Sequence, residues 1–331
     1  MYVNKYHGEE DLSKIKILVT GGAGFIGSNI VEYLVKYGVG KVRILDNLST
    51  GYLENIKMFL ELPNVEFVKG DIRNIGDCQK ACENIDFVLH QAALGSVPRS
   101  IEDPITSNEV NVSGFLNILI AVRDQGVKRI VYAASSSTYG DSKELPKIEE
   151  RIGKPLSPYA VTKYVNELYA DVFTKTYGIE TIGLRYFNVF GPKQNPKGAY
   201  AAVIPLFIQT ALMKKKATIF GDGETSRDFT FVENAVQANI KAIFSKNKNL
   251  VVNIACNQTL TLNNLWREIT DIIGVGNDVT YLDERKGDVK HSLASIELAE
   301  KMLDYHPQVL TKEGLIISCK WYDHYFAQKI Q

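Results

Sequence analysis

The chain has 331 residues, of which 45% are hydrophobic, and its 38 lysines and arginines balance 38 aspartates and glutamates. This length is sufficient for two packed lobes around a large core. The balanced charge argues against a basic surface for nucleic acid, and we expect neither a membrane span, for which no apolar run of roughly 18 residues is available, nor a secretory signal in the polar first residues.

The first predicted element is a short buried strand over 15–20, which leads directly into a glycine-rich turn. The turn carries Gly21, Gly24 and Gly27, and an amphipathic helix follows to about Lys36. The glycines allow a tight turn, a close approach of the backbone to a pyrophosphate, and packing of the helix on the strand. The helix begins with unpaired N–H donors for phosphates, so the segment predicts a dinucleotide site.

The next predicted strand, 42–46, ends with an aspartate whose position predicts which dinucleotide binds. Asp46 lies 19 residues beyond Gly27, the offset of a carboxylate that holds the adenosine ribose hydroxyls. A carboxylate repels a 2′-phosphate, and Asn47 rather than an arginine follows. The sequence therefore predicts NAD rather than NADP, with a solvated turn residue as the alternative for Asp46.

Strands and helices continue to alternate along the chain. Further strands are predicted at 65–68, 86–90, 129–133, 181–185 and 251–254, and helices at about 76–83, 104–124, 159–177 and 201–213. This alternation predicts an α/β fold with a Rossmann-type doubly wound parallel sheet. Glycine- and proline-rich segments in the second half predict a smaller α/β substrate-binding lobe. We assign residues 1–185 plus 227–265 to the NAD-binding domain and 186–226 plus 266–331 to the substrate-binding domain.

The cysteines do not form a recognisable metal site. Cys78 and Cys82 share a face of a predicted helix, but no histidine lies near them, and Cys256 and Cys319 are isolated. The sequence therefore predicts no metal and reduced thiols, as is typical of a cytoplasmic protein.

Polar or small residues follow several predicted strands, where ligands of such sheets bind. Asp71 is placed to contact the adenine amino group, and Gln91, Ala92 and Ala93 leave room for a cofactor. Ser135 ends the next strand and reaches the same crevice.

Tyr159 and Lys163 are four residues apart, so they lie on one face of a predicted helix. The ammonium favours the phenolate, which makes Tyr159 a candidate acid and base beside the cofactor. The same spacing occurs at Tyr37, Tyr139 and Tyr325. Only Tyr159 is expected to be both helical and next to the crevice, where Pro158 sets the first helical turn.

Together these residues resemble a known family. The chain is similar to the extended short-chain dehydrogenase/reductases and, among them, to the NAD-dependent nucleotide-sugar 4-epimerases related to UDP-glucose 4-epimerase. The resemblance rests on Gly21–Gly27, the serine run 135–137, Tyr159 and Lys163, and the segments 185–188, 227–228 and 285–288. Segments 93–100 and 135–141 are most similar to the subgroup that epimerises UDP-N-acetylhexosamines.

The resemblance implies a reversible conversion of UDP-N-acetylglucosamine to UDP-N-acetylgalactosamine through a 4-keto intermediate and transient NADH. Tyr159 takes the proton of the sugar O4, Lys163 lowers the tyrosine pKa and holds the nicotinamide ribose, and Ser135 shares the O4 proton. Relatives that dehydrate or decarboxylate carry carboxylates beside this serine. Here Ser136, Ser137 and Thr138 occupy those positions, with no acid before Asp141.

The resemblance also implies the contact residues of both ligands. For NAD they are Gly21, Gly24, Phe25, Ile26, Gly27, Asp46, Asn47, Ser49, Thr50, Gly51, Asp71, Ile72, Gln91, Ala92, Ala93, Tyr159, Lys163 and Phe187. For the UDP-sugar they are Ser96, Ser135, Ser136, Tyr159, Asn188, Gln194, Ala202, Val203, Thr218, Phe220, Arg227, Phe229, Arg285, Asp288 and Ser292. Arginine forks suit the pyrophosphate, although a lone loop arginine is often a solvated charge.

The sugar preference depends on space at carbon 2. Ser292 matches a position that is tyrosine in galactose-type relatives, and Gly95 and Ala202 are also small, so an N-acetyl group is expected to fit. Two alternatives stay open: a UDP-N-acetylglucosaminuronic acid 4-epimerase, with Arg99 facing the carboxylate rather than solvent, and UDP-glucose 4-epimerase side activity. A third, an NAD-binding redox-responsive protein without turnover, is disfavoured by the intact Ser135, Tyr159 and Lys163.

The resemblance further implies a homodimer through a four-helix bundle built from helices 104–124 and 159–177 of each copy. The apolar positions expected to cover this seam are Leu116, Leu119, Ile120, Leu168, Val172 and Phe173. The alternative is that they pack inward on the sheet.

Overall fold

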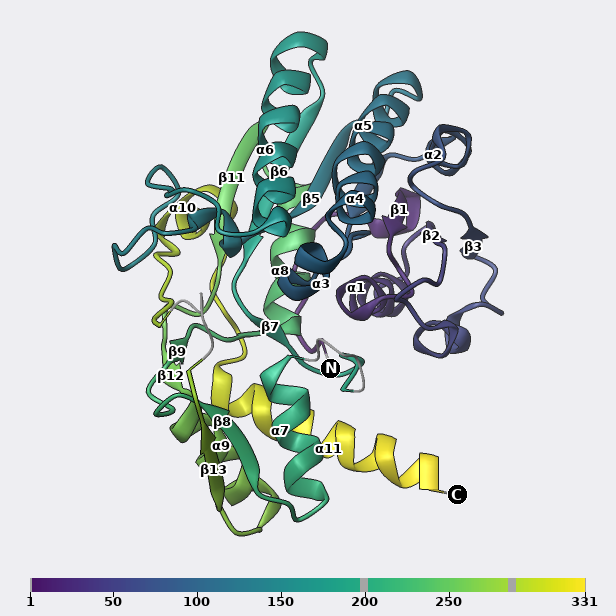
Figure 1. The fold of residues 1–331 in the computed structure, drawn as a ribbon. Helices are drawn as coiled ribbons and strands as arrows, with labels where there is room; N and C mark the ends of the chain where they lie inside the picture. Colours follow the sequence, from purple (N-terminus) through teal and green to yellow (C-terminus); the bar gives the residue numbers. More distant parts are fainter. Residues whose placement is uncertain (1, 197–201, 285–289, 331) are drawn as a thin grey trace.

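The structure, a computed structural model, describes residues 2–196, 202–284 and 290–330 (Figure 1). Its centre is a seven-stranded sheet with the strand order β11-β6-β5-β4-β1-β2-β3, in which all neighbours are parallel. The strands are β1 Lys16–Thr20, β2 Lys41–Asp46, β3 Val65–Lys69, β4 Phe87–His90, β5 Arg129–Ser135, β6 Glu180–Tyr186 and β11 Asn249–Ile254. The predicted doubly wound sheet is confirmed, and no strand end differs from its expected position by more than two residues.

Helices cover both faces of this sheet, because the central strands are apolar on both sides. On one face lie α1 (Phe25–Lys36) and α8 (Val232–Ile243). On the other face lie α2 (Ile75–Cys82), α5 (Gly114–Asp124) and α6 (Pro158–Tyr177), with a core of their own. The sequence did not predict α8, which returns the chain from the second lobe to the first.

The helix expected at 104–124 is continuous in space but changes its hydrogen-bonding pattern along its length. It consists of α4 (Pro104–Asn108), a π-helical turn over Glu109–Ser113 and α5. In the described part of the chain this is the one helical segment that is long and apolar enough to cross a membrane, with a mean hydropathy of 1.2. Its buried residues, among them Phe115 and Leu119, pack against the sheet, which accounts for its apolar composition.

The smaller lobe packs around a third core. It contains α7 (Val203–Leu212), α9 (Leu262–Ile273), α11 (Thr311–Ile330) and the parallel pair of β8 (Ala217–Phe220) with β13 (Val279–Leu282). Figure 1 shows these elements below the sheet. The predicted helix 201–213 is α7, shortened at both ends, whereas α9 and α11 were not predicted.

Short elements complete the described chain. They are α3 (Val97–Glu102), α10 (Glu297–Leu303), β7 (Val189–Phe190), β9 (Ser226–Arg227), β10 (Thr230–Phe231), β12 (Leu260–Thr261), and the 3-10 turns Leu12–Lys14, Leu53–Asn55, Lys57–Phe59 and Ser136–Tyr139. The pairs β7–β10 and β9–β12 join segments distant in sequence. α10 packs on β11 of the main sheet and on α8, which covers one face of that sheet. The division into 1–185 plus 227–265 and 186–226 plus 266–331 remains a prediction.

Candidate active site

A cavity of about 610 Å³ lies at the carboxyl ends of the parallel strands. Its wall takes residues from the ends of β1 to β6 and from α6, because parallel strands bring these ends to one edge of the sheet. The predicted site residues on its wall are Gly21, Gly24, Phe25, Ile26, Gly27, Asp46, Asn47, Ser49, Thr50, Gly51, Asp71, Ile72, Gln91, Ala92, Ala93, Ser96, Ser135, Ser136, Tyr159, Lys163, Asn188, Gln194 and Ala202. The wall of this one cavity thus contains predicted residues for both NAD and the UDP-sugar.

The glycine-rich turn is shaped so that side chains would not fit. Gly21 has φ of +66°, and a Cβ there would lie 2.7 Å from the backbone nitrogen of Ala92. A Cβ on Gly27 would lie 2.2 Å from the carbonyl oxygen of Gly21. α1 begins at Phe25 with no side-chain cap, and Gly24, Phe25 and Ile26 line the cavity, so the first N–H groups of the helix are available to a ligand there. We call this turn, Gly21–Gly27, the cradle. Its lack of side chains fits the pyrophosphate of a dinucleotide.

Asp46 is held in place by the backbone of two neighbouring turns. Its Oδ2 accepts a hydrogen bond from the amide of Ala23 at 2.9 Å and its Oδ1 from the amide of Leu48 at 2.8 Å. Burial raises the pKa of this carboxyl group, and only 7% of the residue is exposed. The solvated-turn alternative is therefore wrong. The remaining lone pairs of the carboxylate suit ribose hydroxyls.

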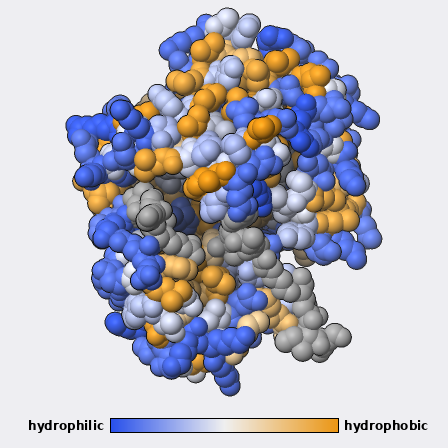
Figure 2. Space-filling view, viewed as in Figure 1, coloured by the Kyte–Doolittle hydropathy of each residue, from blue (hydrophilic) through white to orange (hydrophobic). Residues whose placement is uncertain are grey.

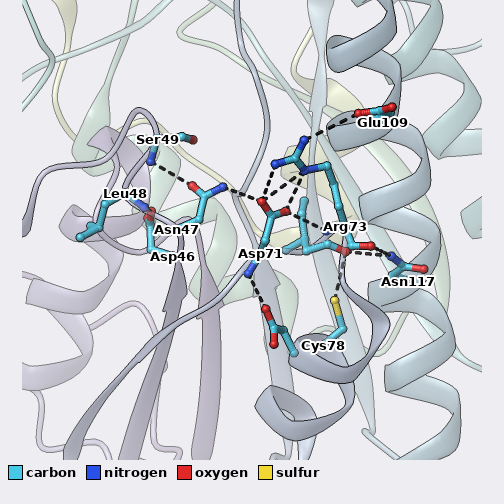
Figure 3. Close-up of polar contacts among 11 residues, drawn as sticks. Asp46, Asn47, Leu48, Ser49, Asp71, Arg73, Cys78, Glu109 and Asn117 are labelled. Carbon is cyan, nitrogen blue, oxygen red and sulfur yellow. Dashed lines mark hydrogen bonds and ion pairs between the residues drawn. The ribbon is translucent and has the colours of Figure 1, made fainter.

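Asp71 belongs to a polar network that the sequence did not predict (Figure 3). Its carboxylate pairs with Arg73 at 2.7 Å and accepts a hydrogen bond from the Asn47 amide at 3.0 Å. The hydrogen bonds from Arg73 lower the pKa of Asp71 to about 2. Arg73 extends the network to Glu109, which lies 3.6 Å away. Asp71 is thus ionised and already well supplied with donors, and its contact with adenine stays a prediction.

Tyr159 lies in the first turn of α6, at a position fixed by capping. Ser157 caps the helix by accepting a hydrogen bond from the Ala160 amide, and Pro158 follows. The Tyr159 amide donates to Ser100 of α3 at 3.0 Å, which ties the helix start to the cavity wall. Lys163 follows one turn later, with Nζ donating to the carbonyl of Ala133 at 2.8 Å and lying 5.9 Å from the centre of the Tyr159 ring.

The charges around Tyr159 differ from the expectation. Burial raises the pKa of the phenol, and its hydrogen bond with Ser135 offsets this only in part. Burial also lowers the pKa of Lys163 to about 8. The expected net depression of the tyrosine pKa is therefore wrong for this structure, because desolvation outweighs the hydrogen bond from Ser135.

Position at the cavity, rather than helical structure, distinguishes Tyr159 from the other tyrosine–lysine pairs. Tyr37 caps the end of α1 and Tyr139 lies in a 3-10 turn. Tyr325 lies within α11, so helical structure alone does not distinguish Tyr159. Among these four tyrosines, only Tyr159 lines the cavity.

Three polar side chains beside the cavity form a closed ring of hydrogen bonds that sequence reasoning missed. Gln91 donates to Asn239 at 3.0 Å, Asn239 donates to the Tyr186 hydroxyl at 2.6 Å, and this hydroxyl donates back to Gln91 at 3.3 Å. Burial raises the pKa of Tyr186, so its proton is available for this ring. Asn239 lies on α8, 148 residues from Gln91, and no local pattern connects them.

His90 makes folding sensitive to acid. It is 3% exposed, shares a hydrogen bond with Thr20 at 2.8 Å, and burial lowers its pKa to about 3. Below pH 6.5 the unfolded chain binds a proton that the folded chain refuses down to about pH 3, so stability falls as the pH falls through this window. We expect His90 to contribute about 2 kcal/mol of the loss in unfolding free energy between pH 7 and pH 5.

Urea unfolding at both pH values tests this expectation on wild type and His90→Asn, whose amide can keep the Thr20 contact. The variant is less stable at pH 7 because the ring volume is lost, but its pH dependence should be shallower. An equal pH dependence in both proteins would contradict the assignment.

A second cavity of about 330 Å³ adjoins the first and lies in the smaller lobe. The two share Asn188, Val189 and Ala202 on their walls. The predicted substrate residues on its wall are Asn188, Ala202, Val203, Thr218, Phe220, Arg227 and Phe229. The guanidinium of Arg227 donates to the carbonyls of Ser226 and Lys290, which fixes its position. A mostly apolar pocket with one arginine suits a base and a phosphate.

Two predicted residues lie off both cavity walls, and two more are not described by the structure. Phe187 is fully buried against Tyr139, off both cavity walls, and Ser292 donates its amide to Ser226 without lining either cavity. Their roles stay predictions. Arg285 and Asp288 lie outside the described residues. Arg99, for which a solvent-facing position was the alternative, lies on the wall of the first cavity.

Comparison with known proteins gives a consistent result. A model of the NAD dependent epimerase/dehydratase family matches residues 17–255. A putative UDP-glucose 4-epimerase of Methanocaldococcus jannaschii is 40% identical over 307 residues, which cover 92% of this chain and 97% of that protein.

Two solved structures extend the comparison. UDP-N-acetylglucosamine 4-epimerase from Methanobrevibacter ruminantium, in complex with UDP-N-acetylmuramic acid, has a TM-score of 0.90 at 40% identity and covers 94% of this chain and 99% of that chain. UDP-glucuronic acid 4-epimerase from Bacillus cereus, in complex with UDP-glucuronic acid and NAD, has a TM-score of 0.86 at 30% identity, with 94% and 100% covered.

Proposed function

The chain belongs to the NAD-dependent epimerase/dehydratase family, and on that premise we propose that it interconverts UDP-N-acetylglucosamine and UDP-N-acetylgalactosamine. At the coarser level it is a UDP-sugar 4-epimerase with NAD as its cofactor. The observation that carries the proposal is the meeting of Ser135, Tyr159 and Lys163 on the wall of a cavity that also holds the dinucleotide cradle.

NAD, held by the glycine-rich turn and Asp46, would supply the acceptor and donor of the hydride at carbon 4 of the sugar. The chain's own residues supply the proton chemistry at O4. Tyr159 is fixed by the start of α6 and exchanges the O4 proton, and Ser135 shares a hydrogen bond with the phenol and the sugar. Lys163 is buried beside the tyrosine, and its charge opposes the desolvation that disfavours the phenolate.

Epimerisation is favoured over dehydration because no acid lies at the sugar end of the cavity among the residues that the structure describes. Among the described residues on the wall of the first cavity, the carboxylates are Asp46 and Asp71, both at the ends of strands on the adenosine side. The nearest acid after the serine run, Asp141, is exposed and accepts a hydrogen bond from the Lys154 amide. Elimination across C5–C6 needs an acid and a base beside the sugar, so a plain 4-epimerase is the better reading.

An N-acetylated sugar is favoured by open space on the wall. Nothing lies within 4 Å of a Cβ built on Gly95, and Ala202 borders both cavities. Ser96 and Gln194 line the same wall and offer hydrogen-bond partners for an acetamide. The buried Oε1 of Gln194 has no hydrogen-bond partner among the described residues, so it is open to such a donor.

The test is an assay of purified protein with UDP-N-acetylglucosamine, UDP-glucose and UDP-N-acetylglucosaminuronic acid separately, with proton NMR reading the configuration at carbon 4. We expect turnover of the neutral N-acetylated sugar to exceed that of UDP-glucose.

Ser292→Tyr should reduce the N-acetyl preference by about 10-fold or more, because a tyrosine there fills the space for the acetamide. Thr280→Tyr, at an exposed position of β13, is the control. An unchanged preference in Ser292→Tyr would remove Ser292 from the site.

A second candidate substrate, the N-acetylated uronic acid, is favoured by one observation. Arg99 is half-buried on the cavity wall, three residues after Ser96, and a guanidinium there suits a carboxylate. If the uronic acid alone turned over in the assay and Arg99→Gln abolished this, the second candidate would replace the first. Retention of NAD without turnover of any substrate would instead favour a redox-responsive binding protein.

We also propose that two copies pair through α6 and its neighbours. Leu119 and Phe173 pack inward, so the expected seam is wrong at these two positions. Leu168 and Val172 are half-exposed, and the exposed apolar residues of the adjoining α3 and α4 extend this face: Val97, Ile101 and Ile105. Figure 2 shows apolar side chains interspersed on this part of the surface. Sedimentation analysis of Val172→Glu, compared with wild type, tests the homodimer.

We propose that the protein is cytoplasmic, because its cysteines are reduced. Cys78, Cys82, Cys256 and Cys319 are all buried and unpaired. Burial raises the pKa of each thiol to about 12, which makes them unreactive. Fractionation of the source cells tests the assignment.

A further inference from the structure

A short segment of the chain, 191–195, crosses beside the cavity on its way from β7 to α7, and we call it the strap. Gln194 and Asn195 of the strap line the cavity, together with Phe25, Ile26 and Gly27 of the glycine-rich turn. The strap therefore borders the same space as the cradle for the dinucleotide. It belongs to the part of the chain that leads into the smaller lobe, whereas the cradle belongs to the main sheet.

Three side chains from the first sixty residues hold the strap. Asn29 of α1 donates to the carbonyl of Pro192 at 3.1 Å, and Tyr52 accepts a hydrogen bond from Asn195 at 2.7 Å. Glu32 of α1 pairs with Lys193 at 2.6 Å. The Lys193 side chain is only 11% exposed, so this ion pair is more sheltered than most pairs at a protein surface. Lys193 also adopts φ of +71°, a conformation that a non-glycine residue takes only when its surroundings require it.

The amino-terminal segment sets the orientation of Asn29. The hydroxyl of Tyr2 donates to Asn29 Oδ1 at 3.0 Å, so the amide NH₂ must face the other way, toward the carbonyls of Phe25 and Pro192. Tyr2 is fully buried, and the Tyr37 hydroxyl donates to its carbonyl at 2.8 Å. A continuous chain of contacts thus runs from Tyr2 through Asn29 to the strap.

We propose that Tyr2, Asn29 and Glu32 are positioning residues that hold the strap against the cavity, and so set how slowly NAD leaves and where Gln194 meets the UDP-sugar. The inference rests on the proposed function for the sugar, but not for NAD retention. NAD is regenerated in each cycle of a 4-epimerase, so an enzyme that keeps it bound avoids rebinding it. The helix α1 holds the strap, and its own first turn borders the cradle. The retention of NAD therefore depends on this one helix in two ways.

The test measures NAD dissociation from the loaded protein, by trapping released NAD with an excess of a dehydrogenase. Loss of one buried hydrogen bond or ion pair should speed release by about tenfold in Asn29→Leu and in Glu32→Lys. Tyr2→Phe keeps the ring and loses only the hydroxyl, so it should speed release by a smaller factor. The exchanged pair Glu32→Lys with Lys193→Glu restores the attraction and should return release toward the wild-type rate.

Lys241→Glu is the matched control, because it reverses the charge of a similarly sheltered lysine, paired with Asp304 away from both cavity walls. It should leave NAD release unchanged even if it lowers the melting temperature. In the strap variants, KM for the UDP-sugar should rise more than kcat falls, since Gln194 binds rather than reacts. Wild-type release rates in all strap variants would overturn the proposal and leave the epimerase assignment intact. Absence of epimerase activity in the wild type would overturn only the assignment.

Discussion

Replacing Tyr159 with phenylalanine is expected to lower kcat for epimerisation by about 10³-fold, the scale of general acid–base assistance. The change removes one oxygen and leaves the ring in place at the start of α6. No proton acceptor of comparable pKa remains at O4, because the Ser135 hydroxyl is a far weaker acid than a phenol. Folding should be preserved, since the helix is fixed through the backbone contact with Ser100 and the Ser157 cap rather than through the phenol.

The measurement is kcat by NMR or coupled assay, together with the amount of NAD that stays with the purified protein. NAD content should match the wild type, which separates loss of chemistry from loss of the site. Tyr177→Phe, at the exposed end of α6, is the control and should retain full activity. Activity within a few-fold of wild type in Tyr159→Phe would refute the role of this tyrosine.

Replacing Gly27 with alanine should abolish NAD retention and with it more than 99% of activity. Its Cβ would lie 2.2 Å from the Gly21 carbonyl and 2.8 Å from the Gly22 Cα, and both are backbone atoms that cannot turn aside. The turn must open, which removes the close approach of backbone to pyrophosphate. The strain also costs about 1–3 kcal/mol of stability, as overpacking usually does.

Gly276→Ala is the matched control, because a Cβ there meets nothing within 4 Å and its φ lies outside the positive range that disfavours side chains. NAD content measured by absorbance after denaturation, and the melting temperature with and without added NAD, separate the cradle from general instability. A Gly27→Ala protein that still binds NAD tightly would show that the turn is not the phosphate site.

Most of the main sheet was predictable because its signals are local. Five of the seven strands, β1 to β5, are short runs that end in a polar residue. The order of the residues along the chain already places Asp46, Ser135 and Tyr159 at strand or helix ends. The predicted residues of the first cavity follow from this rule, since parallel strands share one carboxyl edge.

The missed features depend on contacts between distant segments. The ring of Gln91, Asn239 and Tyr186 needs α8 to cross the sheet, and the strap needs α1 to lie beside the loop after β7. Neither has a periodic signal. The α8 helix was missed because small and polar buried residues interrupt its apolar pattern, among them Asn234 and Gln237. The pKa of Tyr159 was misjudged because a helical spacing shows a charge but not its burial.

The two joined cavities have a consequence for the direction of the reaction. On the proposed function, the uridine diphosphate keeps its pocket in the smaller lobe whichever way carbon 4 points, and only the sugar turns in the shared space near Asn188 and Ala202. Substrate and product then draw most of their binding energy from the same anchor, so the protein favours neither. Accumulated product therefore competes with substrate for the pocket about equally. As with any catalyst, the final ratio is set by the relative free energies of the two UDP-sugars in water. Net flow in a cell must therefore come from a following step that removes one of the two.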